Sequence, residues 1–266
     1  MFRRVFLGFA ATFLLVVSTA QAQERLGVLL MHGKQGQARE SRTGMGIVAS
    51  NLEGAGHKVL MPTMPWAGSD WERINVTVEQ VHALIDGYVA QLRGQGAQRI
   101  VVGGHSLGAN VALSYAVARG NVAGVAMIAP GHNPGYVYRV EKGGRDSIDK
   151  ARDLVQAGRG GEAYQGLDNN QGRGFTLSTT AAVYHSWLNP QGLAAMETQA
   201  PRLPASIPVL LVIGEKDPAF GRAENGIYRP AARHPYSKYL ANGADHATTP
   251  MASSKAITDW IVGLPR

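Results

Sequence analysis

Short apolar runs alternate with helical segments along most of this sequence, and that alternation constrains its fold more than any other feature. Leu26–Met31 and Ile207–Ile213 are almost continuously apolar, as are strands buried on both faces of a sheet. Between them, residues 75–92 carry apolar side chains at three- and four-residue spacing, which is typical of an amphipathic helix. The pattern predicts the α/β class, with a mostly parallel central sheet flanked by helices.

Other segments follow the same order. We predict further strands at 58–61, 99–102, 122–128 and 237–240, and further helices at 41–52, 107–119 and 254–264. The alternation stops between residues 131 and 203. That stretch is rich in glycine and has no clear strand, with helices predicted at 148–155, 181–187 and 193–199. We therefore expect residues 131–203 to form a small, mainly helical cap insertion over one end of the sheet.

Residues 1–22 are predicted to be a secretory signal peptide. Arg3 and Arg4 precede an apolar run that ends at Val17, and Ala20-Gln21-Ala22 is a small-x-small cleavage pattern. The alternative is an uncleaved anchor, but the run is short for a bilayer span, which needs about 20 residues. We expect cleavage after Ala22, a periplasmic or secreted protein, and one domain over residues 23–266 with no membrane span.

Composition excludes several classes of function. The chain has 26 basic and 19 acidic residues, a net charge of +7 that falls to about +5 without the signal peptide. Because the bases are scattered and form no run, nucleic-acid binding is not expected. The sequence contains no cysteine, which excludes disulfides, thiolate nucleophiles and zinc–thiolate sites. We predict no metal and no cofactor.

The segment Gly104-His105-Ser106-Leu107-Gly108 stands where a predicted strand ends and a predicted helix begins. Glycines two residues on either side of a serine relieve the crowding of a sharp strand-to-helix turn, which exposes the hydroxyl. The helix also directs its N–H groups and positive dipole toward that point. A serine in a glycine-rich turn would give the same five letters, so the position between strand and helix carries the prediction that Ser106 is a nucleophile.

A serine nucleophile needs a base within hydrogen-bond reach. His246 lies in a loop after the last predicted strand, and parallel strands all end at one edge, so it shares the edge of Ser106. His234, which precedes that strand, is the alternative base. His105 lies inside the turn and is expected to point away from Ser106.

The base in turn needs a carboxylate that orients it. Asp217 follows the predicted strand at 207–213 and is the preferred candidate. Glu215 and Asp245 are the alternatives, although Asp245 is adjacent to His246 and neighbouring side chains usually diverge.

Together these segments resemble the α/β-hydrolases, in particular exported bacterial members of that superfamily. The resemblance is carried by His32-Gly33 after the first strand, by the Ser106 motif, by Gly214-Glu215-Lys216-Asp217-Pro218, and by Asp245-His246. It implies catalysis by Ser106, Asp217 and His246, in the chain order of that fold. It also implies an oxyanion hole formed by the backbone N–H groups of Leu107 and Lys34.

The first loop departs from the His-Gly-Gly-Gly form found in one group of lipases and esterases. It reads His32-Gly33-Lys34-Gln35-Gly36, which argues against membership of that group. Backbone donors need no particular side chain, so the expected oxyanion hole is retained. For the Lys34 side chain we consider two alternatives: a solvated loop lysine, or a cation that faces an anionic substrate.

The expected function is hydrolysis of an ester-type bond in a small-molecule acyl substrate, through an acyl-enzyme. The candidate pocket residues are His32, Trp66, His132 and Trp187, together with Trp71, Tyr184 and His185, and internal packing is the alternative role for each. A catalytically silent binding or accessory protein is the main alternative function, since fold alone does not establish activity. A phosphate or dinucleotide site is disfavoured because the glycines at 103, 104 and 108 do not match either binding motif.

Overall fold

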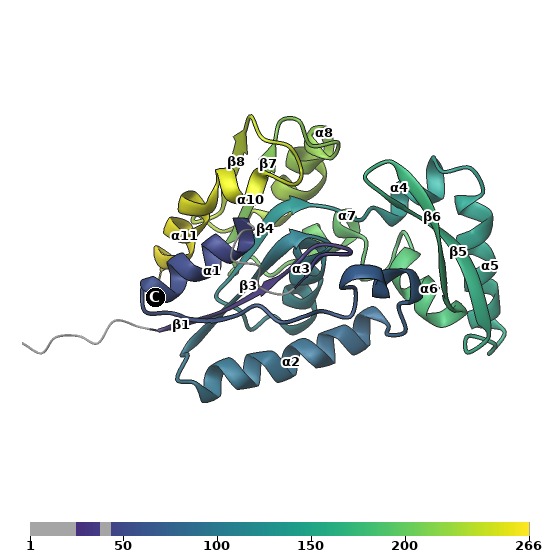
Figure 1. The fold of residues 1–266 in the computed structure, drawn as a ribbon, viewed down its shortest axis with the longest axis horizontal. Helices are drawn as coiled ribbons and strands as arrows, with labels where there is room; N and C mark the ends of the chain where they lie inside the picture. Colours follow the sequence, from purple (N-terminus) through teal and green to yellow (C-terminus); the bar gives the residue numbers. More distant parts are fainter. Residues whose placement is uncertain (1–24, 38–43, 266) are drawn as a thin grey trace, which may run out of the picture.

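The computed structural model describes residues 25–37 and 44–265 and shows a six-stranded sheet between two layers of helices (Figure 1). The strand order is β2-β1-β3-β4-β7-β8, and every neighbouring pair is parallel. The strands are β1 (Leu26–Met31), β2 (Lys58–Leu60), β3 (Arg99–Ser106), β4 (Gly124–Pro130), β7 (Val209–Gly214) and β8 (Lys238–Asn242). The predicted α/β class is confirmed.

Helices cover both faces of this sheet, which explains why its central strands are apolar throughout. The face of α1 (Gly44–Gly54) and α11 (Ser254–Val262) is opposite that of α2 (Val78–Gly94) and α3 (Leu107–Arg119). Successive side chains of β1 alternate between the two cores: Val28 packs with the first pair, and Leu29 with the second. A strand in this position buries every side chain.

Local signals set the helix boundaries. Thr77 caps α2 by accepting from the Gln80 N–H, and the Gln80 side chain accepts from the Thr77 N–H, which is a capping box. At the C-terminus of α3, Gly120 adopts a left-handed conformation with φ 66°, as glycines that follow helices often do. The predicted α1 would begin at residue 41, but residues 38–43 lie outside the described chain, as does the predicted signal peptide.

Between β4 and β7 the chain forms a cap beyond one end of the sheet, and this cap contains two strands that the sequence analysis missed (Figure 1). The strands β5 (Ala163–Asn170) and β6 (Arg173–Thr180) pair as an antiparallel hairpin. Its helices are α4 (Pro134–Arg139), α5 (Gly144–Gln156) and α6 (Ala181–Leu188), whereas α7 (Met196–Gln199) packs against α3. The expectation that this stretch contains no clear strand is therefore wrong.

The hairpin escaped prediction because its inward face carries little apolar patterning. Gly166 and Asp168 occupy buried positions where alternation would require apolar residues. The two-residue turn at Gln171 and Gly172 has φ values of 54° and 78°, which match a type I′ turn. Such turns favour Asn-Gly or Asp-Gly, so Gln-Gly is a weak signal.

The remaining elements are short and lie in the connections between the longer helices and strands. They are η1 (Gly68–Arg73), η2 (Ala200–Arg202), α8 (Phe220–Arg222), η3 (Ala223–Tyr228), α9 (Arg229–Ala231) and α10 (Thr249–Ala252). In the described part of the chain, none of the helices is both long and apolar enough to span a membrane.

The hairpin is packed closely against α6, which leads to a first prediction. A Cβ atom at Gly166 would lie 2.1 Å from Cε2 of the buried Tyr184 ring, whereas Gly174 in the same hairpin has open space. We expect Gly166→Ala to lower the free energy of unfolding by about 1–3 kcal/mol through overpacking. Urea denaturation measures the change, with Gly174→Ala as the matched control. Equal stability of the two variants would contradict the close packing described here.

Candidate active site

The backbone at Ser106 makes a sharp, strained turn at the carboxyl end of β3. Ser106 has φ 55° and ψ −116°, an unusual conformation for a residue other than glycine, and α3 begins at the next residue. A Cβ atom at Gly104 or Gly108 would lie 2.5 Å or 2.3 Å from the Met31 carbonyl oxygen. The two glycines of the motif are therefore required, because any side chain would push the turn away from β1.

Asp217 and His246 come together beside this edge of the sheet. Asp217 follows β7, His246 follows β8, and the His246 Nδ1–H donates to Asp217 Oδ2 at 2.7 Å. The carboxylate is buried, and its other oxygen accepts from the Ala219 N–H at 2.7 Å. Because a carboxylate only accepts, Nδ1 carries the proton and Nε2 is left as the basic nitrogen.

The alternative candidates have other roles. Asp245 Oδ1 accepts from the backbone N–H and hydroxyl of Thr248 and so stabilises a turn. Glu215 is exposed, and His234 Nδ1 accepts from the Tyr236 N–H. Of the candidate carboxylates, Asp217 is the one that contacts His246.

His105 lies next to the serine and contacts the loop of His246. Its Nε2–H donates to the His246 carbonyl oxygen at 2.9 Å, and the two ring centroids are 4.8 Å apart. Burial, with a smaller contribution from His246, lowers the pKa of His105 to about 4, so the ring is neutral at pH 7. His105 thus fixes the backbone of the His246 loop, a role that the sequence pattern did not indicate.

Two further loops approach Ser106 closely. A Cβ atom at Gly33, after β1, would lie 3.0 Å from Ser106 Cβ. A Cβ atom at Gly131, after β4, would lie 2.5 Å from the Ser106 hydroxyl oxygen. Backbone therefore approaches the Ser106 side chain from two sides, and glycine at both positions leaves space for it.

A cavity of about 250 Å³ begins at Gly131 and extends under the cap. Its walls come from the loop after β4, the loop after β7 and the tip of the hairpin. They are formed by Pro130, Gly131, His132, Asn133, Tyr136, Val137, Asn169, Asn170, Gln171, Gly172, Asp217, Pro218, Ala219 and Arg222. Within residues 25–37 and 44–265, no three His, Cys, Asp or Glu side chains are grouped as metal ligands.

Only one of the four preferred pocket residues lines this cavity. His132 does so, whereas Trp66 and Trp187 are fully buried, and their rings pack edge to face 6.0 Å apart. Trp66 Nε1–H donates to the His32 carbonyl at 2.9 Å, and Trp187 Nε1–H donates to Val76 at 2.8 Å. The prediction that Trp66 and Trp187 line the pocket is wrong: both rings pack in the protein interior against each other.

His32 is likewise a packing residue that organises the loop after β1. Its Nε2 accepts from the Met64 N–H at 3.0 Å, and its Nδ1 contacts the Gly33 carbonyl at 2.9 Å. Burial lowers the pKa of His32, which keeps the ring neutral. The prediction that His32 lines the pocket is therefore wrong: its ring stabilises the loop after β1 through hydrogen bonds. Trp71 and Tyr184 are also fully buried, and His185 lies at a different surface hollow.

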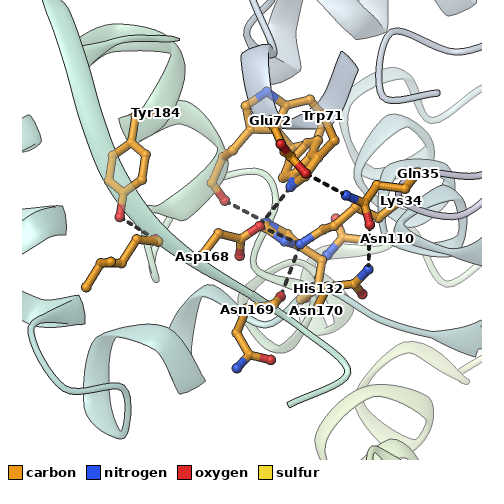
Figure 2. A network of polar contacts seen from close by, with 12 residues as sticks. Lys34, Gln35, Trp71, Glu72, Asn110, His132, Asp168, Asn169, Asn170 and Tyr184 are labelled. Atoms are coloured by element: carbon orange, nitrogen blue, oxygen red, sulfur yellow. Dashed lines mark hydrogen bonds and ion pairs between the residues drawn. The ribbon is translucent and has the colours of Figure 1, made fainter. Parts of the chain in front are cut away.

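The Lys34 side chain matches neither of the two predicted alternatives. Its ammonium group is buried and pairs with Asp168 Oδ2 of the hairpin at 2.6 Å (Figure 2). The side chains of Lys34 and Asp168 are 2% and 1% exposed. Lys34 is therefore neither solvated nor free to bind an anionic substrate.

The sequence was compared with models of known protein families. The sequence matches the model of the alpha/beta hydrolase family over residues 28–259, so the chain belongs to this family. A comparison with curated protein sequences gave no match.

Solved structures share the fold. A monoacylglycerol lipase from Paleococcus ferrophilus is similar with a TM-score of 0.62 and 20% identity, over 90% of this chain and 95% of that one. Est1E from Butyrivibrio proteoclasticus, solved with ferulic acid, has a TM-score of 0.61 and 14% identity over 92% of both chains. A carboxyl esterase from Bacillus coagulans has a TM-score of 0.58 and 16% identity, over 90% and 89%.

The buried histidines make stability depend on pH. Burial, with a smaller contribution from Lys34, lowers the pKa of His132 to about 4 from an ordinary value of 6.5. Its neutral form is therefore favoured in the folded state, and the stability it contributes above pH 6.5 is lost as the pH falls toward 4. For a pKa shift of this size, we expect the free energy of unfolding to fall by about 1–2 kcal/mol per histidine between pH 7 and pH 5.

Urea denaturation of wild type and His132→Asn at both pH values measures this contribution. Asparagine tolerates the left-handed backbone of His132, which has φ 58°. We expect the variant to lose less stability than wild type between pH 7 and pH 5. An identical pH dependence in the two proteins would contradict the assignment.

Proposed function

We propose that the protein is an exported serine hydrolase that cleaves ester bonds in small-molecule acyl substrates. The observation that carries this proposal is the 2.7 Å hydrogen bond from His246 to the buried Asp217, beside the strained turn of Ser106. A histidine with a fixed tautomer, at the same sheet edge as a serine in a strained turn, supports catalysis by acyl transfer, which needs a base and a serine nucleophile. Export rests on the predicted signal peptide at residues 1–22.

The reaction follows from the roles of the three side chains. His246 Nε2 takes the hydroxyl proton as Ser106 Oγ bonds to the acyl carbon, and the carbonyl electron pair moves onto its oxygen. When the tetrahedral intermediate collapses, the bond to the leaving alkoxide breaks and His246 returns the proton to it. Water then attacks the acyl-enzyme with His246 again as base, which releases the acid and restores Ser106.

Two backbone donors are proposed for the oxyanion. Leu107 is the first residue of α3, so its N–H faces the region where the helix dipole is positive. Lys34 follows Gly33, whose Cα lies close to the serine side chain. Each donor of this kind stabilises the transition state by about 3 kcal/mol.

The similar structures support ester hydrolysis, since they are described as a monoacylglycerol lipase, esterases and a dienelactone hydrolase. The alternative is a silent binding protein with the same fold. The alternative gives no reason for a buried aspartate aimed at a histidine, or for strain at the serine.

The cavity favours small substrates. Its volume of about 250 Å³ is below the common range of ligand pockets, which starts near about 300 Å³. Asn133, Asn169, Asn170 and Arg222 contribute polar walls. A long alkyl chain would exceed this volume.

Active-site substitutions test the chemistry. We expect Ser106→Ala to abolish both ester hydrolysis and covalent labelling by a fluorophosphonate probe. Asp217→Asn should lower kcat about 10³- to 10⁴-fold, because the amide no longer holds the His246 tautomer. Asp245→Asn is the matched control, because Asp245 adjoins the same histidine without orienting it, and it should retain kcat within about twofold. Unchanged turnover by Ser106→Ala would refute the proposal.

Substrate size gives a second test. With p-nitrophenyl esters we expect kcat/KM for acetate or butyrate to exceed that for palmitate by about 100-fold or more, since longer chains do not fit the cavity. The measurement uses mature protein and monomeric substrate concentrations. A preference for palmitate would contradict the small-pocket assignment.

A further inference from the structure

The loop that carries Lys34 is a strained turn. The Gly36 N–H donates to the Gly33 carbonyl at 2.9 Å, and Gln35 between them has φ 58°, as at the third position of a type II turn. That position favours glycine, so a glutamine there costs conformational energy. Such a conformation persists where surrounding contacts hold it.

One corner of this turn is held from the cap. Lys34 Nζ donates to Asp168 Oδ2 at 2.6 Å and to the Asn169 carbonyl at 3.3 Å, and it lies 4.7 Å from the centre of the Trp71 ring (Figure 2). Trp71 Nε1–H donates to the same Asp168 oxygen at 2.9 Å. The lysine side chain therefore ends in a fixed site between η1 and β5.

The other corner contacts the same hairpin. The Asn170 amide donates to Gln35 Oε1 at 3.4 Å, and the Gln35 N–H donates to the Trp66 carbonyl at 2.9 Å. Three successive hairpin residues, Asp168, Asn169 and Asn170, thus contact the two corner residues of the turn. We name these contacts the hairpin clamp.

A role in stability alone does not account for the ion pair. Burial acts to raise the pKa of the Asp168 carboxyl, but the charge of Lys34, a smaller contribution from His132 and the hydrogen bonds that the carboxylate accepts together outweigh it, so the pKa is lowered. Burial lowers the pKa of Lys34 more than Asp168 raises it. The second oxygen, Asp168 Oδ1, is buried without a hydrogen-bond partner. Buried pairs with incomplete hydrogen bonding stabilise a fold no better than apolar residues of similar size.

We propose that the hairpin clamp positions the turn at Lys34 so that its N–H points at the substrate oxyanion, and that Lys34 and Asp168 are positioning residues for the reaction. This inference rests on the proposed function, which uses that N–H. It makes the cap part of the catalytic machinery as well as a wall of the cavity. A donor displaced by about 1 Å loses much of its effect on the transition state.

The test combines kinetics with hydrogen exchange of the backbone. In Asp168→Asn, we expect kcat to fall about tenfold or more with KM within about threefold, since the donor acts mainly in the transition state. We also expect amide exchange in residues 32–37 to rise about tenfold. Asp86→Asn is the matched control: it breaks the ion pair with Arg119, between α2 and the end of α3, and should change neither measurement.

A double variant separates positioning from stability. Lys34→Met/Asp168→Asn removes both buried charges, and the asparagine oxygen can still accept from Trp71 Nε1–H, so its thermal stability should be close to that of wild type. We expect its kcat to stay about tenfold below wild type. Recovery of kcat together with stability, or unchanged exchange in residues 32–37 of Asp168→Asn, would overturn the proposal.

The outcomes also distinguish this inference from the proposed function. If wild type neither hydrolyses esters nor reacts with a fluorophosphonate, the hydrolase proposal fails. Hydrogen exchange still decides whether the clamp holds the turn, because that measurement does not depend on turnover.

Discussion

The close approach of backbone to backbone around Ser106 is the constraint on which the site depends. The Met31 carbonyl lies against Gly104 and Gly108, and Gly131 lies against the serine hydroxyl. Because β1, β3 and β4 are neighbouring parallel strands, their carboxyl ends bring these three segments to one point. The rigid sheet thereby fixes a strained serine that a mobile loop would allow to relax.

Around this point, buried side chains hold backbone rather than touch the cavity. Neutral His105 fixes the His246 loop, and neutral His32 joins the loop after β1 to Met64. Lys34 and Asp168 extend the same principle to the cap. The residues that orient the proposed catalytic groups are consequently drawn from three separate parts of the chain: the loop after β1, the Ser106 motif and the hairpin.

Sequence periodicity predicted the parts of the molecule where burial follows a simple rule. The strands β1 and β7 are buried on both faces, and α3 spans the same residues as the predicted helix. The positions of Ser106, Asp217 and His246 follow from the rule that parallel strands end at one edge. The hairpin could not be found in this way, because its inward face carries Gly166 and Asp168.

Misassigned side chains share a different cause. Trp66, Trp187 and His32 have the chemistry of pocket residues, and composition does not show whether such a group faces a cavity or a neighbouring ring. Lys34 was misread because its partner, Asp168, is 134 residues away in the sequence. Without a contact across that separation, a lysine in a glycine-rich loop has the pattern of a solvated charge.

The exposed turn at Gln171 and Gly172 has a consequence for how proteins of this architecture diversify. It forms one wall of the cavity, yet it lies at the tip of a hairpin, outside both hydrophobic cores. Loop tips of this kind accept replacement and insertion more readily than packed elements do. Substitutions or insertions at the tip can therefore change substrate selectivity without altering the strands that hold the proposed catalytic residues.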